Sequence, residues 1–166
     1  MISNQEIVEE IVGQFGEKVF AFEEPYGMLT FCSETSQLVD VVKFLKEHKT
    51  FKFTFLTDVT AVHYPEETGK EICSVCHLHS WENGVRVRIK VYAPISQPDV
   101  PSLTGLFEAA NWLEREAFDF FGVNYLNHPD LRRILNMDEM DYHPLRKEYP
   151  LEDGTRNDKI DALFGR

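Results

Sequence analysis

The sequence predicts an α+β fold that ends in an extended, irregular C-terminal arm. Three patterns support this: three segments have helical periodicity, β-prone runs are joined by short turns, and prolines interrupt the last part of the chain. The chain has 166 residues, of which 43% are hydrophobic, and this suits one domain with a substantial core. We therefore expect one α+β domain over residues 1–123 and the arm over residues 124–166.

The first predicted element is a helix that begins at Ser3. Ser3 and Glu6 have the Ser-x-x-Glu spacing of a capping box, in which each side chain satisfies a backbone N–H of the other. Apolar residues then recur at helical spacing, at Ile7, Ile11 and Phe15. A glycine is a common helix stop, so the helix should end near Gly13 or Gly16.

A hairpin, a second helix and a strand are expected next. The β-prone runs Val19–Phe22 and Met28–Phe31 are separated by a segment that contains proline and glycine, which is typical of a hairpin. Residues from about Ser36 to His48 have one apolar face and one charged face, as an amphipathic helix requires. Residues 51–62 are rich in aromatic and β-branched side chains and predict a buried strand.

A further hairpin is predicted to join Ile72–Trp81 with Val85–Tyr92 through Asn83-Gly84. Asn-Gly favours a two-residue type I′ turn, which would pair Glu82 with Val85 and place Ser80 opposite Val87. Alternation along the strands then gives a core face made of Cys76, Leu78, Ser80, Val87, Ile89 and Val91. The opposite face would be a basic and aromatic patch made of His77, His79, Trp81, Arg86, Arg88 and Lys90.

A third helix is expected over Leu103–Phe120. Its apolar residues have helical spacing, and Gly122 would close it. Beyond residue 124 no period persists, because Pro129, Pro144 and Pro150 interrupt any helix. We expect this part to be ordered but irregular, with the exception of the polar tail after Leu151, which is typical of a disordered segment.

Charge and composition exclude some functions. Lys plus Arg number 17 and Asp plus Glu number 28, so the net charge is 17 − 28 = −11, which disfavours binding to nucleic acid. The N-terminal sequence lacks a secretory signal and no run of 18 apolar residues occurs, so no transmembrane segment is expected and we expect a cytoplasmic location. Three cysteines are few and odd in number, so they do not form a disulfide framework, and reduced thiols are expected.

The segment Cys73-Ser74-Val75-Cys76-His77 matches the motif that attaches c-type haem and half of a zinc or iron–sulfur site. On a strand, however, residues three apart point to opposite faces, so the two thiols would not bind one cofactor. His77 and His79 share a face, but the neighbouring cations would repel a metal ion. A haem or metal protein that uses Cys73, Cys76, His77 and His79 stays open as an alternative. The basic face itself is interpreted either as a solvated surface or as one that docks an acidic or anionic partner surface.

The third predicted helix carries a dense polar cluster, Glu114, Arg115, Glu116 and Asp119. Arg115 and Asp119 are four residues apart, the spacing of an ordinary helix ion pair worth about 0.2–0.5 kcal/mol. Two carboxylates such as Glu114 and Asp119 can also support acid–base catalysis, which keeps a stand-alone enzyme open as an alternative. Sequence motifs for nucleotide binding or for a nucleophilic serine are absent.

Two similar turns follow in the predicted arm, at residues 128–133 and 143–147. Each has the order His-Pro, then leucine, then one or two basic residues. Proline stiffens the backbone, and guanidinium groups bind carboxylates, so these turns suit an arm that lies over another surface. That surface is either a partner or the arm's own domain.

The chain resembles the 30 kDa subunit, the NuoC family, of bacterial NADH:quinone oxidoreductase, respiratory complex I. The resemblance rests on three blocks in order: Ala110 to Val123, His128 to Leu135, and His143 to Pro150. It implies a two-layer sandwich of a mixed β-sheet with helices packed on one face. It also implies a non-catalytic assembly subunit in the peripheral arm of a proton-translocating enzyme, without a cofactor of its own. FMN, iron–sulfur clusters and quinone would be bound by partner subunits.

The resemblance further implies the partners and the interface residues. The expected partners are subunits D, B and I, with the complex holding this chain peripherally on the cytoplasmic side of the inner membrane. Carried over by motif, the interface residues are Glu114, Arg115, Glu116, Asp119, His128, Arg132, Arg133, His143, Arg146 and Lys147. The equivalent subunit of an energy-converting hydrogenase or a related ion-pumping complex is the alternative within the same superfamily.

Overall fold

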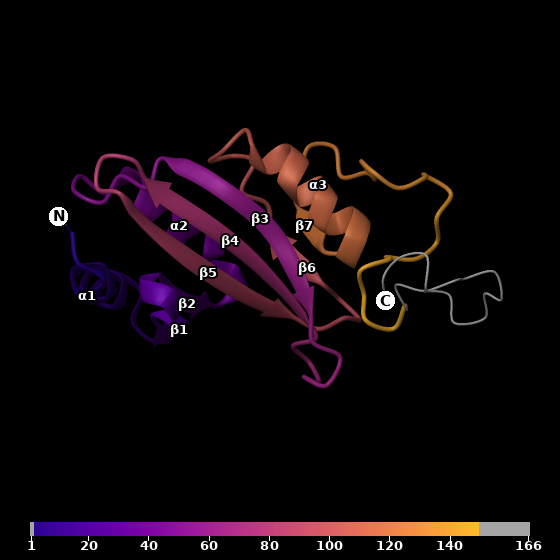
Figure 1. Ribbon diagram of the computed structural model, residues 1–166, viewed down its shortest axis with the longest axis horizontal. Helices are drawn as coiled ribbons and strands as arrows, with labels where there is room; N and C mark the ends of the chain where they lie inside the picture. Colours follow the sequence, from indigo (N-terminus) through magenta and orange to yellow (C-terminus); the bar gives the residue numbers. More distant parts are fainter. Residues whose placement is uncertain (1, 150–166) are drawn as a thin grey trace, which may run out of the picture.

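A computed structural model describes residues 2–149, and a mixed five-stranded sheet forms its centre (Figure 1). The strand order is β1-β2-β5-β4-β3. The strands are β1 (Val19–Glu23), β2 (Leu29–Ser33), β3 (Phe55–His63), β4 (Ile72–Ser80) and β5 (Val85–Ala93). Strands β2 and β5 run parallel, and the other neighbours are antiparallel. The expected α+β class with a mixed sheet is confirmed.

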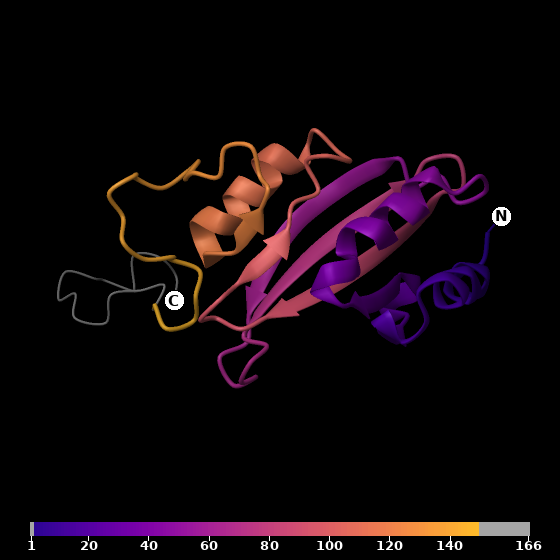
Figure 2. The same cartoon turned by 180° about the vertical axis from the view of Figure 1, so that it is seen from behind.

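Three α-helices accompany this sheet. They are α1 (Asn4–Phe15), α2 (Leu38–Glu47) and α3 (Ala110–Phe121), with short 3₁₀ turns η1 (Gly16–Lys18), η2 (Pro25–Gly27) and η3 (Thr35–Gln37). The capping box between Ser3 and Glu6 is present, which confirms the predicted start of α1. Figure 2 shows α2 lying across one face of the sheet. The buried side chains of α1 and α2 share one core with that sheet face: Ile7, Ile11, Val41, Leu45, Leu78 and Ile89.

The hairpin between β4 and β5 has the predicted faces but a different turn. Ser80 pairs with Val85 rather than Val87, so the predicted register is wrong by two residues and the loop has four residues, 81–84. A shift of two keeps each side chain on its face. Gly84 adopts φ +67°, whereas Asn83 does not have the positive φ that a type I′ turn requires. Instead, the Asn83 amide donates to the carbonyls of Thr50 and Phe51 and to Ser80 Oγ.

Two other predicted boundaries are wrong. Strand β3 begins at Phe55 instead of residue 51, because the chain turns at Lys52, which has φ +49°. Helix α3 begins at Ala110 instead of Leu103, because residues 102–109 form turns that are tied to the side chain of Glu114.

A second, two-stranded sheet lies beside α3. Strands β6 (Asp99–Pro101) and β7 (Asn124–Leu126) are parallel, and the ring of Tyr125 is buried in the core. The Tyr125 hydroxyl lies 3.0 Å from Ser74 Oγ of β4. Residues 124–126 were predicted as the start of the irregular arm, but they form a strand in the body because Tyr125 joins the core. The arm proper is residues 127–149, and the predicted tail after Leu151 lies outside the described residues.

The cysteines of β4 occupy opposite faces of the strand, as the sequence predicts. Cys76 packs in the core, and Cys73 points to the other side of the sheet. Both thiols are buried, and burial raises the pKa of Cys73 to about 11 and that of Cys76 to about 12. Within residues 2–149, His, Cys, Asp and Glu side chains form no group of three or more that could hold a metal ion. In the same range, each helix is too short or too polar to cross a bilayer.

We predict that Asn83→Ala lowers the free energy of unfolding by about 0.5–1.5 kcal/mol. The substitution removes the donor to the exposed Thr50 carbonyl and the partly buried Phe51 carbonyl, and the net loss of a hydrogen bond costs about that much. Glu82→Ala is the control, because Glu82 only forms an exposed ion pair with Lys52. Urea unfolding measures both. Equal losses for the two variants would show that Asn83 does not tie the hairpin to the core.

Candidate functional site

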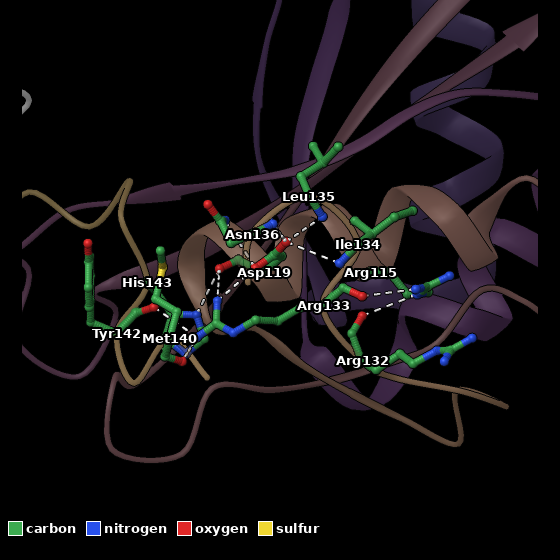
Figure 3. A network of polar contacts seen from close by, with 10 residues as sticks. All are labelled: Arg115, Asp119, Arg132, Arg133, Ile134, Leu135, Asn136, Met140, Tyr142 and His143. Carbon is green, nitrogen blue, oxygen red and sulfur yellow. Dashed lines mark hydrogen bonds and ion pairs between the residues drawn. The ribbon is translucent and has the colours of Figure 1, made fainter. Parts of the chain in front are cut away.

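Asp119, near the C-terminal end of α3, is the centre of the candidate site (Figure 3). Its side chain is fully buried and accepts five hydrogen bonds from the arm. Oδ2 accepts from the backbone N–H of Ile134, Leu135 and Asn136 at 3.1, 2.8 and 2.9 Å. Oδ1 accepts from Arg133 Nη1 at 2.7 Å and from the Asn136 amide at 3.1 Å. These five residues form the Asp119 cluster.

The Asp119 cluster keeps a negative charge inside the protein. Burial by itself would raise the pKa of Asp119, but the N–H donors of Asn136 and Leu135 and the Arg133 guanidinium hold it well below its usual range. The end of a helix also disfavours a negative charge, because the macrodipole is negative there. The carboxylate is therefore stable in this place only while the arm supplies its donors.

Arg133 connects the end of α3 to two further parts of the arm. Its Nη1 also donates to the Asp119 carbonyl at 3.0 Å, and its Nη2 donates to the carbonyls of Met140 and Tyr142 at 2.7 and 2.9 Å. Its side chain is only 10% exposed. One buried guanidinium thus fixes a loop of the arm against the helix.

Arg115 does not pair with Asp119, so the expected ion pair within α3 is wrong. Its guanidinium donates to the carbonyls of Arg132 and Arg133 at 3.2 and 2.9 Å. The reason is that the buried Asp119 carboxylate is already occupied by donors of the arm, with Arg133 as its cation. Arg115 instead satisfies backbone carbonyls of the same segment (Figure 3).

The arm also satisfies the last carbonyls of α3. Gly122 ends the helix with φ +77°, and the carbonyls of Phe120 and Phe121 accept from Leu145 N and Arg146 Nε at 3.1 and 2.7 Å. His143 Nδ1 lies 3.0 Å from the Asp119 carbonyl. A helix end leaves such carbonyls without partners, so the arm acts as the cap of α3.

Gly122 is needed for space as well as for its backbone conformation. A Cβ at this position would lie 2.4 Å from Arg146 Nη2 and 2.6 Å from His143 Cδ2. Any larger residue would therefore have to displace the part of the arm that covers the helix end.

Contacts at both ends extend this attachment along the arm. His128 Nε2 lies 3.0 Å from the Asn111 carbonyl near the start of α3. At the far end, the Lys147 N–H donates to Nδ1 of the buried His63 at 3.0 Å. The arm therefore contacts α3 over most of its length and reaches the end of β3.

The other predicted site residues lie elsewhere. Glu114 is buried and accepts from Ser102 Oγ and Leu103 N, both at 2.6 Å, so it holds the loop before α3 rather than the arm. Burial raises the pKa of Glu114 to about 7. Glu116 is exposed, and Arg132 is exposed and pairs with Asp130 at 2.9 Å. The role of these residues at a subunit interface stays a prediction.

Sequence reasoning missed three contributors to this site, Gly122 as a close contact, Asn136 and His63. Gly122 was recognised only as a helix stop. Asn136 contributes a backbone N–H together with its amide, and His63 acts through a contact 84 residues away in the chain. No local pattern marks such contacts, because they depend on how the arm folds back.

Large apolar side chains point outward around the Asp119 cluster. Leu135 is 65% exposed and Met137 is 69% exposed, and Trp112 on α3 is 57% exposed. Further exposed side chains of the arm are Tyr142, Leu145 and Tyr149. Apolar side chains of this size are typical of protein-binding surfaces where they form one contiguous patch.

Comparison with known families and relatives gives consistent matches. The family described as the respiratory-chain NADH dehydrogenase 30 Kd subunit matches residues 31–155. The chain is 42% identical over 142 residues to the C subunit numbered 2 of NADH-quinone oxidoreductase from Rhizobium meliloti, which covers 85% of this chain and 76% of that one. It is 36% identical over 156 residues to the NADH-quinone oxidoreductase C subunit from Geobacter sulfurreducens, with 94% and 95% covered.

Two solved structures are also similar. A trypsin-resistant fragment of Nqo5 has a TM-score of 0.61 and 27% identity, covering 76% of this chain and 98% of that one. A chain of the membrane-bound sulfane sulfur reductase, an archaeal respiratory membrane complex, has a TM-score of 0.73 and 25% identity, covering 89% and 85%.

We predict that Gly122→Ala loosens the arm as well as straining the backbone. Because the new Cβ would collide with His143 and Arg146, hydrogen exchange at the amides of residues 134–136 should become faster. Gly84→Ala is the control: it also has a positive φ, +67°, but a Cβ there meets nothing within 4 Å. In both variants the backbone strain should lower the free energy of unfolding by about 1–2 kcal/mol. If exchange in the arm is equal in the two variants, the close contact at Gly122 does not hold the arm.

We also predict that Glu114 makes stability depend on pH. Its folded pKa of about 7 lies above its ordinary value of 4.5, so the folded state binds more protons between these pH values. Stability should therefore fall as pH rises through this window and level off above it. At ~1.4 kcal/mol per pH unit, the free energy of unfolding of the wild type should fall by about 2–3 kcal/mol relative to Glu114→Gln between pH 5 and pH 8. Parallel stability curves for the two proteins would contradict a raised pKa.

Proposed function

We propose that this chain is a structural subunit whose arm binds neighbouring subunits. The chain belongs to the family of the respiratory-chain NADH dehydrogenase 30 kDa subunit. It is a subunit of the peripheral arm of NADH-quinone oxidoreductase, and the oxidoreductase activity belongs to the complex. Within that complex, the chain's own contribution is to hold its neighbours at fixed spacing while electrons pass from NADH to quinone.

The Asp119 cluster is the observation that carries this proposal. A fully buried carboxylate fixes residues 133–136 with five hydrogen bonds, although this segment has no regular secondary structure. The same segment directs Leu135 and Met137 into solvent. A protein surface ordered in advance binds with a smaller entropy cost, because less freedom is lost on association. The arm thus combines order with exposed apolar surface, as an assembly surface requires.

The carboxylates of α3 are used for structure. The oxygens of Glu114 face Ser102 and Leu103, and those of Asp119 face the arm, so both accept hydrogen bonds from the chain itself. This geometry disfavours the acid–base enzyme that the sequence left open. We propose that FMN, the iron–sulfur clusters and quinone are bound by partner subunits and that this chain supplies no catalytic residue.

The family supports a proposal for the partners. We propose that the arm contacts subunits D, B and I and that the complex holds this chain on the cytoplasmic side of the inner membrane. We also propose that the complex translocates protons. The likeness to a chain of the sulfane sulfur reductase is the one observation that favours a related respiratory complex. The NADH-quinone oxidoreductase relatives at 36–42% identity favour that enzyme instead.

We predict that Arg133→Ala lowers the amount of assembled complex. Removing this guanidinium leaves the Asp119 carboxylate buried without its cation, which costs about 3–5 kcal/mol and frees the arm. Lys43→Ala is the control, because this exposed cation lies on α2 and takes no part in the contacts of the arm. Native electrophoresis of solubilised membranes measures assembly, and quinone reduction per assembled complex measures turnover. Full assembly of Arg133→Ala with lost turnover would contradict a structural role.

A further inference from the structure

The face of the sheet opposite the core carries exposed side chains at the end near the β4–β5 hairpin. Figure 1 looks onto this face, with β3, β4 and β5 in front of α2. Alternation along the strands brings aromatic and basic side chains together here. The outer patch consists of Phe55, His79, Trp81, Arg86 and Arg88 on β3 and the β4–β5 hairpin, together with Tyr26 from the β1–β2 turn.

The aromatic part of the outer patch is solvent-exposed. Trp81 is 65% exposed and Phe55 is 43% exposed, and their rings meet edge to face with centroids 5.6 Å apart. The His79 ring, which is only 9% exposed, lies beneath them with its centroid 4.5 Å from that of Trp81. Exposed tryptophan beside arginine is the composition of binding hot spots, because both side chains bury large areas when a partner covers them.

The arginines of the outer patch have no acidic partner in the described part of the chain. No side-chain hydrogen bond or ion pair within residues 2–149 involves Arg86, and no carboxylate lies within 4.0 Å of the Arg88 guanidinium. The adjacent Lys90, by contrast, pairs with Glu23 at 2.8 Å. Two acidic residues lie nearby without contacting either guanidinium. Asp58 lies 3.8 Å from His77 Nδ1, and the pKa of Glu23 is lowered first by its hydrogen bond from Lys90 and also by the Arg88 charge.

Arg88 is nevertheless held in position. Its Nε donates to His77 Nε2 at 2.9 Å, so this ring nitrogen carries no proton. Burial, and then the Arg88 charge, lowers the pKa of His77, which keeps the ring neutral and able to accept. The terminal nitrogens of Arg88 are left for an acceptor outside the described chain. A guanidinium fixed in this way loses little freedom when it binds a carboxylate.

A hollow beside the hairpin completes the outer patch. It has a volume of about 390 Å³, and its lining includes Tyr26, His79 and Arg86. Tyr26 is fully exposed at a turn position with φ +57°. The hollow offers an aromatic ring and a guanidinium to one inserted side chain.

We propose that the outer patch is a second docking surface, which binds an acidic protein surface. Carboxylates of the partner would face Arg86 and Arg88, and an apolar side chain would pack on Trp81 and Phe55. The local positive charge of the two arginines and the exposed aromatic area beside them argue for this partner. The inference rests on the proposed function only in taking the partner to be another subunit of the complex.

Charge reversal tests the outer patch in the assembled complex. The full-length chain is expressed in its native cell as wild type, as Arg86→Glu/Arg88→Glu, and as Lys18→Glu/Lys43→Glu. The last variant makes the same charge change at two exposed lysines on η1 and α2, which contribute nothing to the outer patch. We expect the arginine variant to lower the fraction of chain in the complex about tenfold and the lysine variant to change it less than twofold.

Photo-cross-linking of the assembled complex identifies the partner independently of those variants. A photoreactive amino acid replaces Trp81 in one strain and the exposed Val12 on α1 in a control strain. We expect a cross-link from position 81 to an Asp- or Glu-rich segment of another subunit. Changing those acids to lysine should restore assembly of the Arg86→Glu/Arg88→Glu variant.

Three results would overturn the inference: equal assembly of the two double variants, cross-links from position 81 only to lipid or nucleic acid, or no cross-links beyond the Val12 control. Absence of the wild-type chain from the complex would instead contradict the proposed function. If Arg133→Ala fails to assemble while the arginine variant assembles like its control, only the second docking surface is lost.

Discussion

A buried negative charge near the end of a helix is the constraint on which the candidate site depends. Asp119 has no exposed surface, and the helix dipole and burial both act against its charge. Three consecutive backbone N–H groups, one guanidinium and one amide compensate it, and all belong to residues 133–136. The irregular arm and the end of α3 therefore stabilise each other, because each satisfies groups that the other leaves open.

Helix α3 is the element that places the arm relative to the sheet. Its middle carries Glu114, which ties down the loop that leads into the helix, and its end carries the Asp119 cluster. Alanines at positions 110 and 117 pack into the core on the same helix. Gly122 then lets His143 and Arg146 close over the helix end. The core thus fixes the position of α3, and α3 in turn fixes the segment of the arm that carries Leu135 and Met137.

Local patterns predicted much of the fold and only part of the site. Periodicity and the capping box located α1 and α2, and alternation assigned the faces of β4 and β5 correctly. The hairpin register failed because the Asn83 side chain bonds to carbonyls some thirty residues away in the chain. The predicted start of α3 and the predicted partner of Arg115 were wrong for the same kind of reason. In each case a buried carboxylate accepts hydrogen bonds from segments outside the helix. The family motifs pointed to Asp119 and Arg133, while the geometry that joins them needs the folded arm.

The structure of the assembled complex, determined by electron cryo-microscopy, is the most direct test of the account. The account predicts that Asp119 still accepts the N–H groups of Ile134, Leu135 and Asn136 in the complex. It also predicts that the side chains of Leu135 and Met137, exposed here, are covered by another subunit. An arm detached from Asp119, or one whose apolar side chains still face solvent in the complex, would contradict it.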